Sequence, residues 1–205
     1  MISLIDYGLG NINAFKSAYK KLGKKCKIVN SPDQLKNDAT HIILPGIGSF
    51  DESINKLKEK KFDSILNKLI KSGQSKILGV CVGFQIMCDS SDEGKENGLG
   101  WLKGKVKKIP NSNSLLLPHM GWNKLNIKNN SELFSGILSN EFYFLHSYNV
   151  FAELNDQDYV TSKVFYGQDL ISSISKKNIF GVQFHPEKSQ KNGQNFINDF
   201  FRWTP

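Results

Sequence analysis

Short apolar runs alternate with amphipathic stretches over the first half of the chain. Four runs have the length and composition of buried strands, at residues 2–5, 26–29, 41–44 and 76–80. Three stretches place their apolar residues at helical spacing, over residues 13–22, 51–60 and 62–71. Gly23 and Gly73 follow two of these stretches as stop signals, and residues 45–50 are expected to form a tight loop. Strands that alternate with helices in this way predict a parallel sheet covered on both faces.

Beyond Gly98 the apolar runs become shorter, which is typical of antiparallel or mixed strands. We expect strands at residues 103–109, 115–117, 142–145, 160–165, 170–175 and 179–184. A last amphipathic stretch, residues 195–203, predicts a helix that turns its phenylalanines inward: Phe196, Phe200 and Phe201. No internal repeat or low-complexity linker divides the chain. We therefore expect one domain over residues 1–205 with an α/β fold, a three-layer, mixed and largely parallel sheet with flanking helices.

Composition and charge limit the classes of protein to which the chain can belong. Hydrophobic residues make up 39% of the chain, no apolar run approaches the roughly 18 to 20 residues of a membrane span, and the first residues lack a signal-peptide layout. The net charge of +8 comes almost wholly from scattered lysines, which argues against a nucleic-acid partner. Cys26, Cys81 and Cys88 are odd in number and lack metal-ligand spacing, which favours a reducing compartment. We expect a cytoplasmic protein without a membrane, metal or cofactor site.

The strongest chemical signal is a cysteine between two glycines, where the strand at 76–80 meets a helical segment that starts near Phe84. Glycine is disfavoured inside strands and helices, so Gly79 and Gly83 indicate that the backbone geometry around Cys81 is specified. A strand-turn-helix corner of this kind is the nucleophile elbow of hydrolases, which holds a side chain in a strained position. The positive end of the following helix would favour a thiolate on Cys81.

A second motif supplies a base for this thiol. Pro186 is expected to end the last strand directly after His185, and Glu187 lies two positions on, on the same face by strand alternation. A carboxylate there would fix the tautomer and the basicity of the imidazole, so the three chemical groups together predict a nucleophilic triad. The other histidines are weaker candidates: His41, His119 and His146.

The two motifs together resemble the signature of the class I (triad) glutamine amidotransferases, and the resemblance runs the length of the chain. Five ordered segments are similar to the glutaminase subunits of imidazole glycerol phosphate synthases: residues 6–11, 44–50, 118–123, 146–148 and 183–189. The resemblance implies a class I glutaminase-like fold with a nucleophile elbow. It also implies hydrolysis of glutamine to glutamate and ammonia.

Carried over position by position, the resemblance assigns roles to individual residues. It implies a catalytic triad of Cys81, His185 and Glu187. Four residues resemble those that hold the substrate glutamine: Gln85, His146, Ser147 and Tyr148. Four residues resemble the backbone segments that form the oxyanion hole: Val82, Gly46, Ile47 and Gly48.

The resemblance also implies a partner protein. The glutaminase-like pattern occupies the whole chain and leaves no phosphate-binding or dinucleotide motif for an acceptor substrate, so the acceptor site is expected on another chain. In the family this partner is a (β/α)₈-barrel cyclase of histidine biosynthesis, which forms a heterodimer with the glutaminase and uses the ammonia to make imidazole glycerol phosphate and AICAR. Seven residues resemble its partner-facing elements: Asn11, Asn13, Pro118, Met120, Gly121, Trp122 and Asn123. Without a partner, Trp122 would be a core residue and Asn11 a helix cap.

Three alternatives stay open. Val82 and Phe84 depart from residues common in the family, and residues 90–101 also resemble paralogous glutaminases that supply ammonia for amidination of a surface-polysaccharide sugar. A cysteine hydrolase or peptidase on a related elbow fold would need neither Gln85 nor the motif at 118–123. A catalytically silent binding subunit would not react at Cys81 with a glutamine-mimicking diazoketone.

Overall fold

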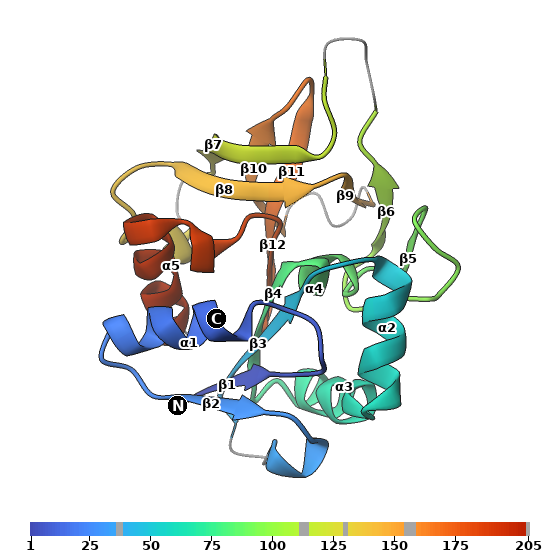
Figure 1. Ribbon diagram of the computed structural model, residues 1–205, viewed down its shortest axis with the longest axis vertical. Coiled ribbons are helices and arrows are strands. Elements are labelled where there is room, and N and C mark those ends of the chain that lie inside the picture. The colour runs from blue at the N-terminus through green and yellow to red at the C-terminus, as the bar shows by residue number, and fades with distance from the viewer. Residues whose placement is uncertain (36–38, 111–114, 129–130, 154–158, 204–205) are drawn as a thin grey trace.

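A nine-stranded sheet organises the computed structural model, which describes residues 1–35, 39–110, 115–128, 131–153 and 159–203 (Figure 1). Its strand order is β2-β1-β3-β4-β12-β11-β10-β7-β8. The parallel part contains β2 (Cys26–Val29), β1 (Ile2–Ile5), β3 (His41–Gly46), β4 (Lys76–Cys81) and β12 (Ile179–Val182). The strands that continue it are antiparallel: β11 (Asp169–Lys176), β10 (Val160–Phe165), β7 (His119–Ile127) and β8 (Glu141–His146). The expected mixed sheet is confirmed.

Helices cover both faces of the parallel part and complete three layers (Figure 1). One face carries α1 (Ile12–Lys21) and α5 (Gln190–Arg202), and the other carries α2 (Phe50–Glu59) and α3 (Phe62–Ser72). Each helix buries an apolar stripe against the sheet, and burial of such area is the main favourable contribution to folding. No helix of the described segments is both long enough and apolar enough to cross a membrane.

Shorter elements surround the carboxyl ends of the parallel strands. A single helical turn, α4 (Val82–Gln85), follows β4 directly, and a small second sheet contains β5 (Ser90–Ser91), β6 (Gly104–Lys108) and β9 (Tyr148–Ala152). Three 3₁₀ turns complete the described elements: η1 (Pro32–Gln34), η2 (Glu132–Phe134) and η4 (Pro186–Lys188). The elements α4, β9 and η4 place side chains around the end of β4, where a site is expected in an open α/β sheet.

An aromatic cluster fixes the chain just before η4. The ring centroids of Phe142 and Phe184 lie 4.3 Å apart, and Phe196 of α5 lies 5.3 Å from Phe184. All three side chains are fully buried. Because a buried aromatic side chain makes many contacts in one orientation, the cluster fixes the backbone that leads from Phe184 into His185.

Several predicted boundaries were wrong. Residues 115–117 form no strand, and the three strands β5, β7 and β9 were not expected. Polar residues and a glycine interrupt the apolar pattern of β7, but its pairing with β8 and β10 outweighs this weak intrinsic preference. The helical segment after Cys81 ends already at Gln85, β3 continues through Gly46 into the expected loop, and the last helix begins at Gln190.

Candidate active site

Cys81 occupies a strained backbone position between β4 and α4. Its φ is 55° and its ψ is −114°, a conformation that residues other than glycine rarely adopt. Such conformations typically cost roughly 1–3 kcal/mol and are found at functional sites. The side chain is 3% exposed. The expected nucleophile elbow is therefore present.

The glycines on either side of the elbow are needed for close packing. Neither Gly79 nor Gly83 has a positive φ, so conformational freedom of the turn does not explain them as we had expected. A Cβ atom on Gly83 would lie 2.0 Å from the carbonyl oxygen of Leu44, and one on Gly79 would lie 2.8 Å from the carbonyl oxygen of Gly83. The missing side chains thus allow α4 to lie directly against β3 and β4.

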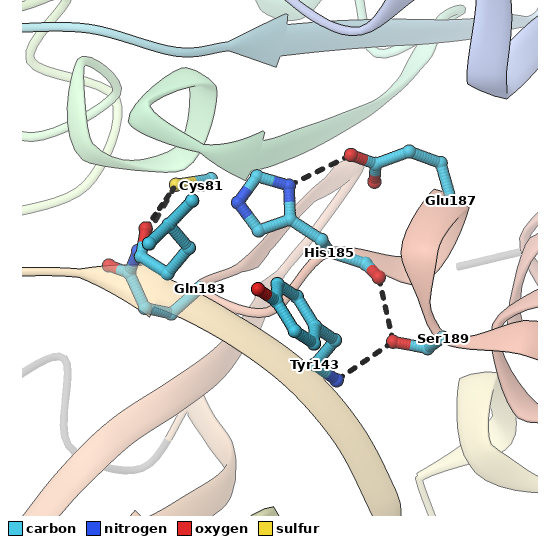
Figure 2. A network of polar contacts seen from close by, with 7 residues as sticks. Cys81, Tyr143, Gln183, His185, Glu187 and Ser189 are labelled. Carbon is cyan, nitrogen blue, oxygen red and sulfur yellow. Dashed lines mark hydrogen bonds and ion pairs between the residues drawn. The ribbon is translucent and has the colours of Figure 1, made fainter. Parts of the chain in front are cut away.

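His185 and Glu187 form a buried pair beside the elbow (Figure 2). The His185 Nδ1 and Glu187 Oε1 atoms lie 2.8 Å apart, and the two side chains are 4% and 1% exposed. Our reason for pairing them was wrong, because β12 ends at Val182 and strand alternation does not extend to these residues. The tight turn η4, which begins at Pro186, brings Glu187 back under the imidazole.

Backbone and hydroxyl groups fix the position of His185. The His185 amide donates to the Tyr143 carbonyl at 2.8 Å, which joins the turn to β8. The Ser189 hydroxyl donates to the His185 carbonyl at 2.7 Å and accepts from the Tyr143 amide at 3.0 Å (Figure 2). These three bonds fix the backbone of His185 and therefore the position of its imidazole beside Cys81.

The charge on His185 is set by its neighbours. Burial by itself lowers the pKa of His185, but the negative charges of the Cys81 thiolate and Glu187, together with the hydrogen bonds to both, outweigh burial and raise this pKa to about 10. At neutral pH the imidazole is therefore protonated and can donate a proton beside Cys81. A thiolate and an imidazolium are the nucleophile and the proton donor that acyl transfer requires.

Gln183 is a contact of the nucleophile that sequence reasoning missed. Its Nε2 group donates to Cys81 Sγ at 3.6 Å (Figure 2). Its Oε1 accepts from Gln85 Nε2 at 3.0 Å. The Gln183 side chain is fully buried. A buried amide must be hydrogen-bonded, so a glutamine two positions before His185 in an otherwise apolar run was the available signal.

A pocket of about 300 Å³ opens in front of Cys81 and His185. It contains most of the residues that the sequence assigned to glutamine and the oxyanion: Ile47, Gly48, Val82, Gln85, His146, Ser147 and Tyr148. Gly46 lies behind them in β3, where a Cβ atom would lie 2.3 Å from the amide nitrogen of Gly83. Gln85 Nε2 also donates to the Tyr148 carbonyl at 2.9 Å, which joins α4 to the far wall.

Two charged side chains on the pocket wall were not expected. Glu93 lines the pocket, and its Oε2 accepts from the amide of Phe50, at the first turn of α2, at 2.8 Å. Lys188 lies at the same pocket and places its Nζ 5.5 Å from the ring centroid of Tyr143. Both residues lie in segments that the sequence singled out for other reasons, and no spacing distinguished them from solvent-exposed charges.

The residues expected at a partner interface separate into two groups. Met120 and Trp122 of β7 are 65% and 48% exposed, so Trp122 is not a core residue. Pro118, Gly121 and Asn13 are also at least partly exposed, and Asn11 precedes α1 without a capping bond from its side chain. Asn123 instead points inward, where its amide group contacts His119 and the Phe165 carbonyl. The interface itself stays a prediction.

The arrangement suits attack on a carbonyl carbon. Cys81 and His185 line the pocket together with Val82, Ile47 and Gly48, and Gly46 pairs with Cys81 between β3 and β4. A thiol, a proton donor and nearby backbone amides are the groups that such a reaction uses. Among the described residues, no three histidine, cysteine, aspartate or glutamate side chains come close enough together to hold a metal ion. The pocket is at the small end of the range for ligand sites, which suits a substrate the size of one amino acid.

Comparisons with known proteins agree with this geometry. The family model described as glutamine amidotransferase class-I matches residues 3–203. The imidazole glycerol phosphate synthase subunit HisH of Leptospira interrogans is 43% identical over 204 residues, and that of Bdellovibrio bacteriovorus is 41% identical; in both cases 98% of each chain is covered. A crystal structure titled glutamine amidotransferase superposes with a TM-score of 0.77 at 18% identity, covering 98% of this chain and 97% of that one, which concerns the fold alone.

Proposed function

The chain belongs to the class-I glutamine amidotransferase family, and we propose that it is the glutaminase subunit of an imidazole glycerol phosphate synthase. It would hydrolyse glutamine to glutamate and ammonia and pass the ammonia to a partner cyclase that makes imidazole glycerol phosphate and AICAR. The proposal rests most directly on Cys81 at a strained elbow beside the buried His185–Glu187 pair. The names of both relatives favour this acceptor over a polysaccharide sugar, and the family favours glutamine over a peptide.

The first step is attack by the Cys81 thiolate on the side-chain amide carbon of glutamine. The carbonyl electron pair moves to oxygen, and the backbone amides of Val82 and the segment at 46–48 stabilise the resulting oxyanion. Loss of one such donor typically costs roughly 3 kcal/mol of transition-state stabilisation. The imidazolium of His185 then protonates the departing nitrogen, so that ammonia leaves and a γ-glutamyl thioester remains on Cys81.

The second step regenerates the enzyme. His185, now neutral, accepts a proton from a water molecule as that water attacks the thioester carbon. The tetrahedral intermediate collapses, glutamate leaves, and the thiolate of Cys81 faces a protonated His185 again. Glu187 contacts His185 through Nδ1 at 2.8 Å throughout, which keeps the imidazolium oriented and stabilised.

The amino-acid end of glutamine would lie against the wall opposite the nucleophile. The Glu93 carboxylate is the negative charge on this wall and can pair with the α-ammonium group of the substrate. The backbone of residues 146–148 faces the same space and supplies the segment expected for the α-carboxylate. The pocket would thus select free glutamine over the same side chain within a peptide, whose backbone carries neither charge.

Substitution Glu93→Gln should raise the KM for glutamine by about 10- to 100-fold, because loss of a charge-assisted hydrogen bond typically costs ~1.5–3 kcal/mol. The change in kcat should be smaller, because this bond stabilises the bound substrate and the transition state equally. Glutamine at position 93 can still accept from the Phe50 amide, so the fold should persist. Steady-state glutamate release measures both constants. Glu96→Gln, which removes the same charge outside the pocket, is the matched control. An unchanged KM in Glu93→Gln would show that the ammonium group binds elsewhere.

We infer that the partner is a (β/α)₈-barrel cyclase bound as a heterodimer. Free ammonia would be protonated in water and lose its nucleophilicity, so direct transfer to a second active site is chemically required. The relatives from Leptospira and Bdellovibrio are both named as subunits of a synthase. Exposed apolar side chains on β7, Met120 and Trp122, lie on the strand that also contributes His119, and they are the side chains we expect the cyclase to cover.

The deciding experiment measures glutamate release by the purified chain with and without the cyclase encoded by the same genome. We expect slow hydrolysis of glutamine alone, strong stimulation by the cyclase, and rescue of a histidine auxotroph when both genes are supplied. Absence of glutamate release in the complex would refute a glutaminase. Hydrolysis that needs a sugar-modifying enzyme instead of the cyclase would assign the ammonia to polysaccharide amidination.

A further inference from the structure

Two buried histidines form a direct contact behind the glutamine pocket. His119 of β7 and His146 of β8 are cross-strand neighbours, and His119 Nδ1 lies 3.0 Å from His146 Nε2. The two residues are 2% and 6% exposed. Neither side chain takes part in the proposed chemistry, although His146 lines the pocket.

The partners of the outer ring nitrogens determine where each proton lies. His146 Nδ1 lies 2.9 Å from the Tyr148 carbonyl oxygen, which can only accept, so Nδ1 carries the proton. With a neutral His146, Nε2 is then an acceptor, and His119 must donate to it from Nδ1. His119 Nε2 is left as an acceptor for the Asn123 side-chain amide at 3.3 Å. The donor and the acceptor of each hydrogen bond in the series from Asn123 to Tyr148 are thereby assigned.

The surroundings keep both rings neutral and in place. Burial lowers the pKa of His119 to about 4 and that of His146 to about 3. The His119 ring stacks between Phe144 and Tyr166, with centroid separations of 4.7 and 4.1 Å. Asn123 is held in turn by donation to the Phe165 carbonyl at 3.0 Å. The imidazole of His119 thus has one orientation, and that orientation presents a donor to His146.

The Tyr148 carbonyl is where this chain of bonds reaches the pocket. It accepts from His146 Nδ1 at 2.9 Å and from Gln85 Nε2 at 2.9 Å. Gln85 donates in turn to Gln183, which contacts the nucleophilic sulfur. The position of this one carbonyl therefore affects both the segment expected to bind the amino-acid end of glutamine and the amide network behind Cys81.

We propose that His119 is a positioning residue for the glutamine pocket: its Nδ1 proton bonds to Nε2 of His146 and holds that ring in place, and His146 Nδ1 in turn holds the Tyr148 carbonyl in its binding position. The assignment of this pocket to glutamine rests on the proposed function. Without the donor at His119, Nε2 of His146 is buried with no partner, and the ring loses the contact that fixes it on this side. The Tyr148 carbonyl, which also accepts from Gln85, then loses its fixed position.

Nitrogen NMR of the full chain tests the tautomers without reference to any activity. At neutral pH, ¹⁵N-labelled histidine should show two neutral rings protonated on Nδ1 and bare on Nε2. The variant His119→Phe, which keeps an aromatic ring in the stack, should remove one of these rings and change the Nε2 chemical shift of His146, because that nitrogen loses its hydrogen-bond donor. A wild-type His146 protonated on Nε2 would overturn the proposal.

Kinetics with the cyclase present test the consequence for glutamine. His119→Phe should raise KM by about 10-fold or more while kcat changes by less than about 3-fold, because a binding contact is lost and the nucleophile is untouched. His119→Asn, whose amide nitrogen can occupy the place of Nδ1, should restore KM to within about 3-fold of wild type. Tyr166→Phe, which keeps the ring stacked on His119 and removes only the hydroxyl that donates to the Leu116 carbonyl, should leave KM unchanged.

Each result decides a different point. An unchanged KM in His119→Phe would reduce His119 to a packing residue and overturn the proposal. An equal rise in Tyr166→Phe, which leaves every hydrogen bond from Asn123 to Tyr148 in place, would do the same. A rise that only His119→Phe shows and His119→Asn reverses would support it. If wild-type protein releases no glutamate at all, the proposed function fails, and the NMR measurement on its own then decides the tautomers.

Discussion

Replacement of Cys81 by alanine should abolish glutamine-dependent synthesis by the complex while leaving ammonium-dependent synthesis intact. The thiolate forms the only covalent bond to the substrate in the proposed mechanism, and loss of a triad nucleophile typically lowers kcat by roughly 10⁶-fold. The acceptor site is expected on the cyclase, so added ammonium salts bypass the missing step. Product formation with glutamine or with ammonium as nitrogen source measures the two activities separately.

Cys26→Ala is the control for this experiment. It removes a thiol from β2, outside the pocket, and should retain both activities. A glutamine-mimicking diazoketone should label the wild type and Cys26→Ala once and fail to label Cys81→Ala. Equal loss of glutamine-dependent and ammonium-dependent synthesis in Cys81→Ala would contradict separate sites for release and use of ammonia.

The second large effect is expected from Glu187→Gln, which should slow glutamate release by about 10²- to 10⁴-fold. Glutamine has the shape of glutamate and can still accept from His185 Nδ1, so the substitution removes the charge with little change of volume. The negative charge of Glu187 and its hydrogen bond both raise the pKa of His185. Without the charge, burial counts for more, and this pKa should fall from its value of about 10.

The pKa of His185 can be followed by NMR titration in both proteins. A lower value means that fewer molecules carry the imidazolium at a given alkaline pH, so the alkaline limb of the kcat profile should move to lower pH. Glu59→Gln removes a carboxylate from an exposed ion pair on α2 and should change neither quantity. If the pKa of His185 stays near its wild-type value in Glu187→Gln, the thiolate alone holds the proton, and the slower rate would have another cause.

Much of the parallel half and of the triad could be predicted from the sequence. Continuous apolar runs indicate four buried strands. Gly79 and Gly83 on either side of Cys81 indicate the elbow, because glycine is disfavoured inside strands and helices. The pairing of His185 with Glu187 was also expected, although a 3₁₀ turn rather than a strand brings the two together. Close spacing in sequence allowed the right contact for the wrong geometric reason.

Contacts between segments that lie far apart in the sequence were harder to predict. Gln183 reaches Cys81 only because β12 lies beside β4, and no local pattern reports which strands are neighbours. His119 and His146 were only weaker candidates for the base, yet they are partners of each other across two paired strands. Glu93 was missed because a carboxylate on a pocket wall has the same local pattern as one on a solvated loop.

The pairing of β4 with β12 has a further consequence. Val80 aligns with Val182 in parallel register, so Cys81 and His185 emerge from adjacent strand ends although about half of the chain separates them in sequence. The hydrogen bonds between β4 and β12, and not the length of the intervening segment, determine the distance between the Cys81 sulfur and the His185 imidazole. Insertions or deletions in the surface loops of that segment should therefore leave the reacting groups in register, and relatives can reshape the outward side of β7 for a different protein while inheriting the same reaction.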